Sequence, residues 1–260
     1  MQVIPIGLRS PLAPGDDLVE EFLRACSDSG VEIATGDVVA IATKAISAVE
    51  GLYIQLSDVR PSSTACKLAR GVRMSPEFVQ AVLDRADQTL GCVRHAILTV
   101  VSGTVAPNAG LDAKNAPRGT LAAWPEDPDL EAWRIREEIR RRTQARVGVI
   151  LVDSGLIPLR RGTVGLAVGV AGMEPLVDYR GRPDIYGRTI RITLMDLADS
   201  LASAAHAVMG EGDELTPFAL IKGARVKIAD SYGRDLILLP QERCAIIGSL
   251  TVGRFPIGTE

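Results

Sequence analysis

Three acidic residues stand in turns that directly follow apolar segments of the chain. Asp112 lies in NAGLDAKN, Asp153 in VILVDSG and Glu211 in VMGEGDE. A carboxylate at the end of a buried element is fixed in direction yet open to solvent, and hard divalent cations such as Mg²⁺ and Mn²⁺ prefer oxygen ligands of that kind. Ser154 adds a hydroxyl beside Asp153. These four residues are therefore candidate metal ligands.

Each candidate also has a plainer interpretation, because acidic residues are common in turns and helix caps, and their spacing alone does not bring the three together. The segment 210–213 has two glycines that would let a phosphate approach the backbone closely. The same segment is also typical of a loop that ends a helix. His206 lies among alanines and is interpreted as a structural histidine, and His95 is too distant in sequence to pair with it.

The composition is that of a folded protein that binds neither nucleic acid nor membrane. Hydrophobic residues make up 47% of the 260 and charged residues 23%, which indicates one compact unit. A net charge of −3 gives no support to a nucleic-acid surface, and 4% aromatic residues leave little material for base stacking. No apolar run approaches the roughly 20 residues of a membrane-spanning helix, and the N-terminus lacks a secretion pattern. We therefore expect a cytoplasmic protein.

Several common catalytic motifs do not occur in the chain. GxSxG, HExxH and GxxxxGK[ST] are all missing from the sequence, which leaves hydrolase and P-loop interpretations without support. No CxxC pair occurs either, so the cysteines are interpreted as small buried side chains in a reducing compartment. These are Cys26, Cys66, Cys92 and Cys244.

Short apolar runs predict buried strands, at 38–42, 96–101, 147–152 and 217–221. The third of these strands delivers Asp153 and Ser154 to its C-terminal end. A glycine-rich stretch follows it without the GxGxxG spacing of a dinucleotide site. The segment 108–119 is rich in Asn, Gly, Pro and Lys and is predicted to be a loop that displays its polar side chains.

Apolar spacing of three and four residues predicts helices between these strands. The first begins after Gly15, and another begins at the N-cap Ser75. A charged helix covers about 130–144, and its arginines are interpreted as a solvated face with i,i+4 ion pairs. The last helix covers about 194–208 and stops at Gly210.

Taken together, an ordered set of segments resembles the coenzyme F420-0 γ-glutamyl ligase family over roughly the first 223 residues. The order and spacing of the set are specific, although each piece alone is weak. The segments are PGDDL (14–18), IATKAISAVEG (41–51), VRPSSTACKLA (59–69), NAGLDAKN (108–115), VGVILVDS (147–154), RRGTVGLAVGVAG (160–172), DYRGRPDIYGRTIRIT (178–193), LADSLASAAHAVMGEG (197–212) and PFALIKG (217–223).

The resemblance implies an α+β fold and an intertwined homodimer of two-lobed subunits. It implies a ligase core over 1–223 and a divergent extension of the same unit over 224–260. It also implies GTP and two Mn²⁺ or Mg²⁺ ions, with K⁺ as a further candidate ion. The expected reaction phosphorylates a carboxylate acceptor such as F420-0, and L-glutamate then displaces the phosphate to form an amide.

The resemblance also assigns roles to individual residues. It places Asp112 and Asp153 as catalytic ligands of a first metal, and Ser154 and Glu211 as ligands of a second. Asn115 matches an amide that contacts the nucleotide, and Thr43 with Lys44 matches a polar pair that touches GTP. Further nucleotide contacts are implied at Arg9, Ser10, Pro11, Leu12, Met209, Gly210, Glu211, Gly212, Asp213, Glu214, Leu215 and Thr216.

Four positions depart from the family pattern. Relatives usually carry SK where this chain has Ser47-Ala48, DxSN where it has Lys114 before Asn115, and Gly-Arg where it has Leu156-Ile157. Two positive groups are thus lost near a triphosphate, and charge-assisted hydrogen bonds are strong ones. We hypothesise that Lys114 restores part of that charge. The departures leave three functions open: a ligase for F420-0 or another acceptor, a non-catalytic nucleotide- or deazaflavin-binding paralogue, and a structural homodimer.

Overall fold

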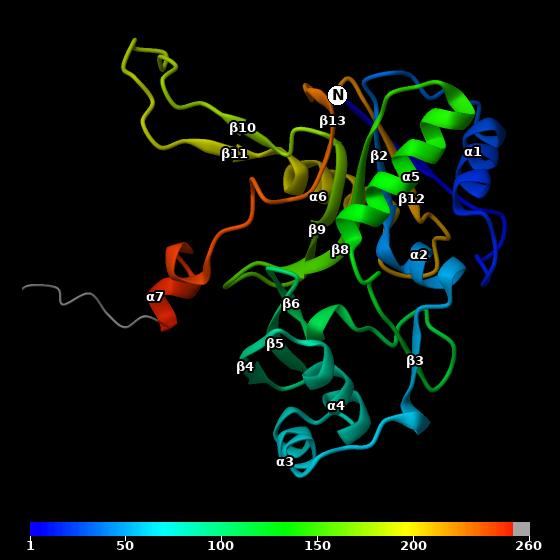
Figure 1. Ribbon diagram of the computed structural model, residues 1–260, viewed down its shortest axis with the longest axis vertical. Coiled ribbons are helices and arrows are strands. Elements are labelled where there is room, and N and C mark those ends of the chain that lie inside the picture. The colour runs from blue at the N-terminus through cyan, green and yellow to red at the C-terminus, as the bar shows by residue number, and fades with distance from the viewer. Residues whose placement is uncertain (252–260) are drawn as a thin grey trace, which may run out of the picture.

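A mixed six-stranded sheet forms the centre of the molecule (Figure 1). The computed structural model describes residues 1–251, with backbone only for Tyr232 and Thr251. The strand order is β1-β12-β2-β8-β9-β13, in which β2 and β8 are parallel and every other neighbouring pair is antiparallel. The strand bounds are Gln2–Ile6 (β1), Phe218–Lys222 (β12), Val38–Ala42 (β2), Gly148–Leu156 (β8), Thr163–Met173 (β9) and Ile228–Tyr232 (β13).

Helices cover both faces of this sheet, because its central strands are apolar on both sides. One face packs against α1 (Leu18–Asp28), α2 (Thr43–Glu50) and α5 (Pro128–Thr143), and Phe22 meets Phe218 there edge to face at 5.3 Å. The other face packs against the alanine-rich α6 (Leu197–Met209).

A third hydrophobic cluster lies outside the main sheet and around the segment that carries Asp112. It joins two helices to a small antiparallel sheet, β4-β5-β6, and to the two-stranded β3-β7 pair. The elements are β3 (Tyr53–Gln55), η1 (Leu56–Asp58), α3 (Ser63–Val72), α4 (Pro76–Arg85), β4 (Gln88–Val93), β5 (Ala96–Val101), β6 (Thr104–Pro107), η2 (Asn108–Gly110) and β7 (Thr120–Ala122). We call this group the α3–α4 unit.

Two further segments extend from the sheet (Figure 1). Strands β10 (Leu176–Asp178) and β11 (Leu194–Asp196) form a hairpin whose long tip projects away from the other elements. We call 176–196 the arm. After β13 the chain continues through η3 (Gln241–Arg243) to α7 (Ile247–Thr251). Residues 252–260 of the extension predicted over 224–260 lie outside the described residues.

The strands and helices expected from the sequence are mostly confirmed, with corrections where tertiary pairing decides. Strand β8 runs four residues past its predicted end, so Asp153 and Ser154 lie within the strand and pair with β9. The glycine-rich stretch is itself the strand β9. Helices α2 and α3 were not predicted, and Leu194 belongs to β11 rather than to the last helix.

Side-chain burial corrects two further predictions. Arg136 of α5 is fully buried and forms an ion pair of 2.5 Å with Asp230, so the arginines of this helix are not all solvated. The i,i+4 spacing favours Glu137 with Arg141 and Glu138 with Arg142. Only the second pair forms, and Arg141 bonds Glu138 in place of Glu137. Among the four free cysteines only Cys26 is buried.

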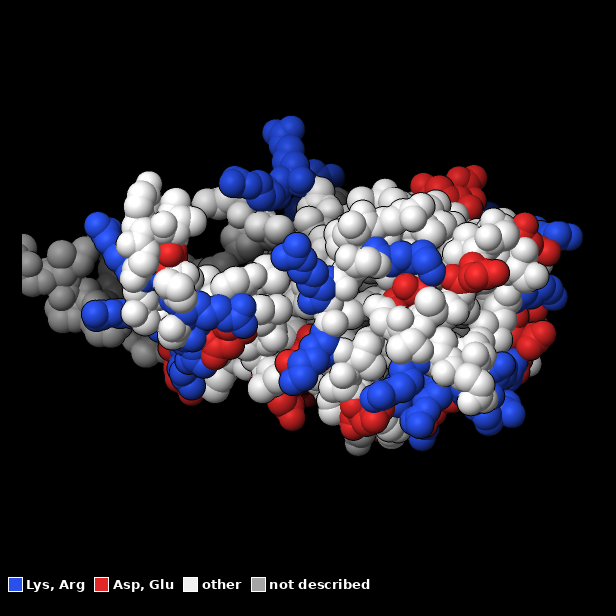
Figure 2. Space-filling view, turned by 90° about the horizontal axis from the view of Figure 1, so that it is seen from above, with Lys and Arg blue, Asp and Glu red and all other residues white. Residues whose placement is uncertain are grey.

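The surface agrees with the balanced charge of the sequence. On the face seen in Figure 2, acidic and basic side chains lie intermixed. In the part of the chain that the structure describes, every helix is too short or too polar to cross a membrane.

Candidate active site

A cavity of about 490 Å³ opens at the edge of the sheet where the two parallel strands end. Ala42 of β2 pairs with Val152 of β8, so the residues that follow them, Thr43 and Asp153, emerge side by side at the rim. Ligands commonly bind at the carboxyl ends of parallel strands. The volume lies within the range of roughly 300–1,000 Å³ that is typical of small-molecule sites.

Asp153 is the most strongly enclosed carboxylate of this cavity. Burial raises its pKa, and the Lys44 ammonium and the hydrogen bond from Trp124 oppose that rise only in part. Trp124 Nε1 donates to Asp153 Oδ2 at 2.6 Å. The nearby charge of Asp112 also raises the pKa of Asp153. A cation placed here would relieve the cost of keeping this carboxylate ionised.

Asp112 does not line the cavity itself, but backbone pairing from another part of the chain holds it beside Lys44 of the rim. It forms an isolated bridge with Ala122, with two backbone hydrogen bonds of 3.1 and 2.8 Å. Its Oδ2 lies 2.7 Å from Lys44 Nζ, and its Oδ1 accepts from the Lys114 backbone N–H at 2.8 Å. The sequence-predicted pair Asp112 and Asp153 is thus brought together beside Lys44.

Glu211 follows the end of α6, and four side chains surround its carboxylate. Its Oε1 accepts from Ser154 Oγ and Thr163 Oγ1, both at 2.6 Å, and hydrogen-bonds to His206 Nε2 at 2.8 Å. Its Oε2 lies 2.5 Å from Lys114 Nζ. Burial alone would raise the pKa of Glu211, but these four donors outweigh it and hold the pKa well below the ordinary range.

Two contacts join the segment after η2 to the loop after α6. Besides the ion pair between Lys114 and Glu211, Asn115 Nδ2 donates to the Gly212 carbonyl at 2.9 Å. Both contacts span 97 residues of sequence. The three predicted acids therefore belong to one charge network, in which Lys44 and Lys114 provide the positive groups.

Most of the predicted nucleotide contacts line the cavity. The helix α2 begins at its rim, and no described side chain caps the N-terminus of that helix. Free backbone N–H groups at a helix start are suited to phosphate. The predicted lining residues that the structure places there are Pro11, Leu12, Thr43, Lys44, Asn115, Met209, Gly210, Glu211, Gly212, Asp213, Glu214, Leu215 and Thr216.

Two predicted contacts are not brought to the cavity. Arg9 points outward and forms an ion pair of 3.0 Å with Asp28 of α1, with 81% of its side chain exposed. Ser10 is also exposed and does not line the cavity. The neighbouring Leu8 lines it instead, so this part of the chain supplies apolar contacts.

Comparison with known proteins connects this cavity to an established family. The family profile described as F420-0:gamma-glutamyl ligase matches residues 7–223, which include every residue of the charge network. The chain belongs to the F420-0:gamma-glutamyl ligase family. It is 38% identical to the coenzyme F420:L-glutamate ligase of Methanopyrus kandleri over 96% of this chain and 95% of the relative.

Two further relatives with the same function support the assignment. The coenzyme F420:L-glutamate ligase of Methanocaldococcus jannaschii is 38% identical over 91% of this chain and 94% of its own. That of Archaeoglobus fulgidus is 35% identical over 94% and 99%. The chain is therefore an enzyme of the ligase class, which removes the non-catalytic and purely structural alternatives.

The donor chemistry of the ligase site fits a hard cation at Asp112 and Asp153 better than at Glu211. The ionised carboxylates of Asp112 and Asp153 repel each other, and a cation shared between them would relieve that repulsion. Within residues 1–251, however, no three His, Cys, Asp or Glu side chains stand together as a ready ion cage. Glu211 is separated from the other two acids by Lys114, which neutralises it directly.

Sequence reasoning missed three residues of the ligase site. Trp124 was not singled out, although Gly110 faces it with a φ of +69° and would place a Cβ only 2.4 Å from its ring. Thr163 gave no signal of its own, because its register on β9 brings it to Glu211. His206 is on α6 as expected, but its partner is a candidate ligand rather than the core.

The departures from the family pattern occupy distinct places in the ligase. Ser47 is buried and donates to the carbonyls of Thr43 and Ala123, whereas Ala48 lines the cavity. Leu156 ends β8 and is 47% exposed, as is the following Ile157. The positions that lack a cation are therefore open to a ligand or to solvent.

Proposed function

We propose that this ligase joins L-glutamate to the carboxylate of coenzyme F420-0, driven by GTP. The observation that carries the proposal is the convergence of Asp112, Asp153 and Lys44 at the uncapped start of α2. Family membership and the function of the named relatives suggest F420-0 and L-glutamate as the substrates. The proposal includes divalent ions, Mn²⁺ or Mg²⁺, at the two aspartates.

The proposed reaction has two steps. An oxygen of the acceptor carboxylate attacks the γ-phosphorus of GTP, GDP leaves, and an acyl phosphate forms. The neutral amine of L-glutamate then attacks the acyl carbon, the C–O bond to phosphate breaks, and the amide loses a proton. Activation is needed because a free carboxylate is a poor electrophile.

The described residues divide this work between them. The N–H groups at the start of α2 and the Lys44 ammonium would bind phosphate oxygens, since both offer positive charge at the cavity rim. Asp112 and Asp153 would hold the ion, which neutralises charge on the phosphates when bound. Trp124 orients the Asp153 carboxylate. The loop 209–216 would cover the nucleotide from the other side.

A second acceptor is favoured by one observation at the end of β8. The exposed Leu156, which ends this strand, and the following Ile157 place apolar surface a few residues beyond Asp153. An acceptor with an apolar portion near its carboxylate would bury that surface, since removing apolar area from water is favourable. A ligase for another carboxylate is therefore the alternative to F420-0.

We also propose that the enzyme is a homodimer of two-lobed subunits in the cytoplasm. The α3–α4 unit with its own hydrophobic cluster would be the smaller lobe. The arm exposes Ile185, Tyr186 and Ile192, each at least four-fifths exposed. Apolar groups concentrated on a projecting hairpin are typical of a surface that a second copy covers. Light scattering of the wild type and of an Ile185→Ser, Ile192→Ser double variant would test the dimer.

The reaction is tested by mass spectrometry of a mixture of F420-0, isotope-labelled L-glutamate, GTP and Mn²⁺. We expect labelled glutamyl product with an equal amount of GDP, and at least a 100-fold loss in Asp153→Asn. The surface variant Lys67→Met should match the wild type. GDP formed without any labelled product would refute F420-0 as the acceptor, and a screen of other carboxylates with the same readout would follow.

A further inference from the structure

Glu211 has little acceptor capacity left for an ion. An ionised carboxylate offers about four lone-pair sites on its two oxygens. Oε1 already meets Ser154, Thr163 and His206, and Oε2 meets the Lys114 ammonium at 2.5 Å. Oε2 keeps one lone pair, but a divalent ion bound there would stand against the Lys114 ammonium and would have to displace it.

Lys114 is held in position by more than this single ion pair. Its backbone N–H is fixed by Asp112 Oδ1 at 2.8 Å, and the next residue, Asn115, is fixed to Gly212 at 2.9 Å. Because the Lys114 backbone and the Asn115 side chain are both anchored, the Lys114 ammonium reaches Glu211 with little further loss of conformational freedom. The charges of Asp112 and Asp153 act on it as well.

The other two acids lack a dedicated positive partner of this kind. Besides the backbone N–H of Lys114, Asp112 meets the ammonium of Lys44, whose helix lines the cavity. Asp153 meets the neutral indole of Trp124. Lys44 can move to a phosphate oxygen without leaving the rim, and Asp112 and Asp153 would then need another cation between them.

We propose that the Lys114 ammonium is the resident cation at Glu211, so that the cavity binds one divalent ion, at Asp112 and Asp153, instead of two. The inference rests on the proposed function only in assuming that the cavity takes up divalent ions. Lys114 thereby also ties the loop 209–216 to the segment that carries Asp112 before any nucleotide is bound.

Counting bound Mn²⁺ tests this without any turnover. Free Mn²⁺ is measured by electron paramagnetic resonance as each protein is titrated in the presence of GDP, with neither F420-0 nor glutamate present. We expect one bound ion for wild type and for the surface control Lys67→Met. Lys114→Met should bind two, because it leaves the Glu211 carboxylate without its ammonium. Two ions on the wild type, or one on a folded Lys114→Met, would overturn the proposal.

A second variant covers the case in which Lys114→Met does not fold. Glu211→Gln keeps the shape of the side chain and one acceptor oxygen, and it removes the negative charge. We expect it to retain one ion with an affinity within about threefold of wild type, because Glu211 is not a ligand of that ion. Loss of the ion in Glu211→Gln would overturn the proposal. The count is independent of catalysis, so failure of the glutamate ligation would leave the ion count intact, and a wrong count would leave the ligation intact.

Discussion

The indole of Trp124 and the carboxylate of Asp153 form a hydrogen bond of 2.6 Å between two different parts of the fold. Trp124 follows β7 of the α3–α4 unit, whereas Asp153 lies on β8 of the main sheet. The bond fixes the direction of the Asp153 carboxylate, whose pKa is raised by its burial in the cavity. We therefore assign Trp124 as a positioning residue for the proposed ion site.

Replacing Trp124 by Phe should reduce turnover while the fold is kept. The ring remains, but the only indole donor to Asp153 is lost, and a hydrogen bond to a charged group contributes about 1.5–3 kcal/mol. We expect kcat to fall on the order of 10- to 100-fold, with a matching loss of Mn²⁺ affinity. The control Trp133→Phe changes an indole on α5. Equal activity in both variants would contradict the role of Trp124.

Gly110 should be intolerant of a side chain because it faces the same indole. A Cβ there would lie 2.4 Å from the Trp124 ring, and the φ of +69° is unfavourable for alanine. We expect Gly110→Ala to lower the free energy of unfolding by about 2–4 kcal/mol. The control Gly119→Ala has a similar φ of +79° but open space around it, and should cost only about 1 kcal/mol. Urea unfolding of both variants measures the difference.

The sequence predicted the elements that carry their own signal. The strand at 38–42 and the N-cap Ser75 were correct because an apolar run and a cap are local features. The extension of β8 through Asp153 was missed because pairing with β9 determines it. Helix α2 was missed because it directly continues β2 without a capping side chain.

The candidate site was predictable only as far as its acids and its loop. Asp112, Asp153 and Glu211 were found from turns and family motifs, but their partners depend on tertiary register. The structure turns Arg9 away from the cavity, because Arg9 pairs with Asp28 of α1. The signal that could have pointed to Trp124 is Gly110, because the close approach of the indole leaves no room for a side chain there.

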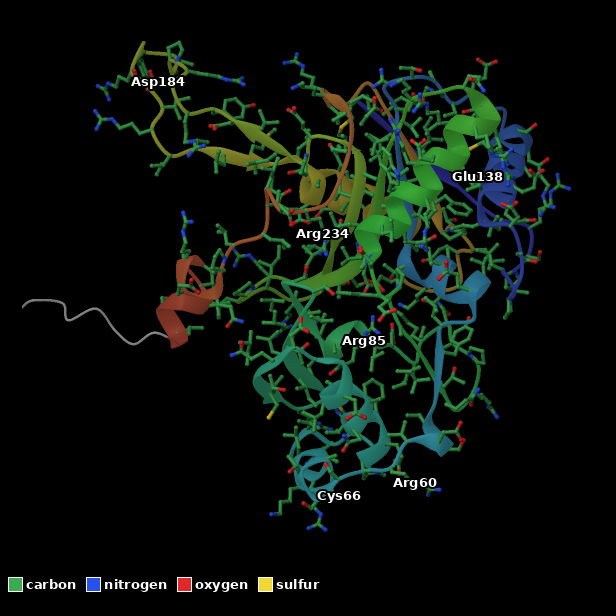
Figure 3. The ribbon with its side chains drawn as sticks, viewed as in Figure 1. Arg60, Cys66, Arg85, Glu138, Asp184 and Arg234 are labelled. Carbon is green, nitrogen blue, oxygen red and sulfur yellow. The ribbon has the colours of Figure 1, made fainter. Side chains whose placement is uncertain are left out.

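Arg234 should stabilise the fold by connecting the segment after β13 to the α3–α4 unit; we call this connection the latch. The side chain of Arg234, labelled in Figure 3, is 3% exposed. It bonds both oxygens of Asp129 at 3.1 and 3.2 Å and donates to Thr104 Oγ1 at 2.7 Å. Asp129 in turn accepts from the Val170 backbone of β9 at 2.8 Å. The buried arginine therefore links the β5–β6 turn to the main sheet through α5.

Replacing Arg234 by Met should destabilise the fold by about 3 kcal/mol, because it leaves the Asp129 carboxylate, which is only 18% exposed, without its charged partner. We expect faster amide hydrogen exchange around the β5–β6 turn than elsewhere in the α3–α4 unit. The exposed control Arg70→Met should change stability by less than about 0.5 kcal/mol. Similar unfolding midpoints for the two variants would refute the latch.

Asp196 should make stability fall as the pH rises. Burial, together with the charge of Asp199, raises the pKa of Asp196 from 3.8 to about 6. A raised carboxyl pKa stabilises the folded state fully below about pH 4, and this contribution is lost as the pH passes 6. Asn keeps the N-cap acceptor of α6. The stability of Asp196→Asn relative to wild type should therefore rise by about 1 kcal/mol between pH 4 and 7, after allowance for solvent screening.

Asp178→Asn provides a control of opposite sign. The hydrogen bonds from Arg180 lower the pKa of Asp178 to about 2, so its stabilising contribution is present above pH 4 and is lost as the pH falls through 2. Urea midpoints of both variants across pH 3 to 8 test the assignment. Parallel curves for Asp196→Asn and wild type would show that Asp196 does not titrate as described.

The central claim is that the two aspartates beside the start of α2 bind the ion that serves the nucleotide. A crystal grown with Mn²⁺ and GDP, with anomalous diffraction recorded for manganese, tests it most directly. We predict manganese density between Asp112 and Asp153, with the phosphates of GDP at the first turn of α2. Manganese bound away from both aspartates, or GDP phosphates outside the cavity, would contradict the account.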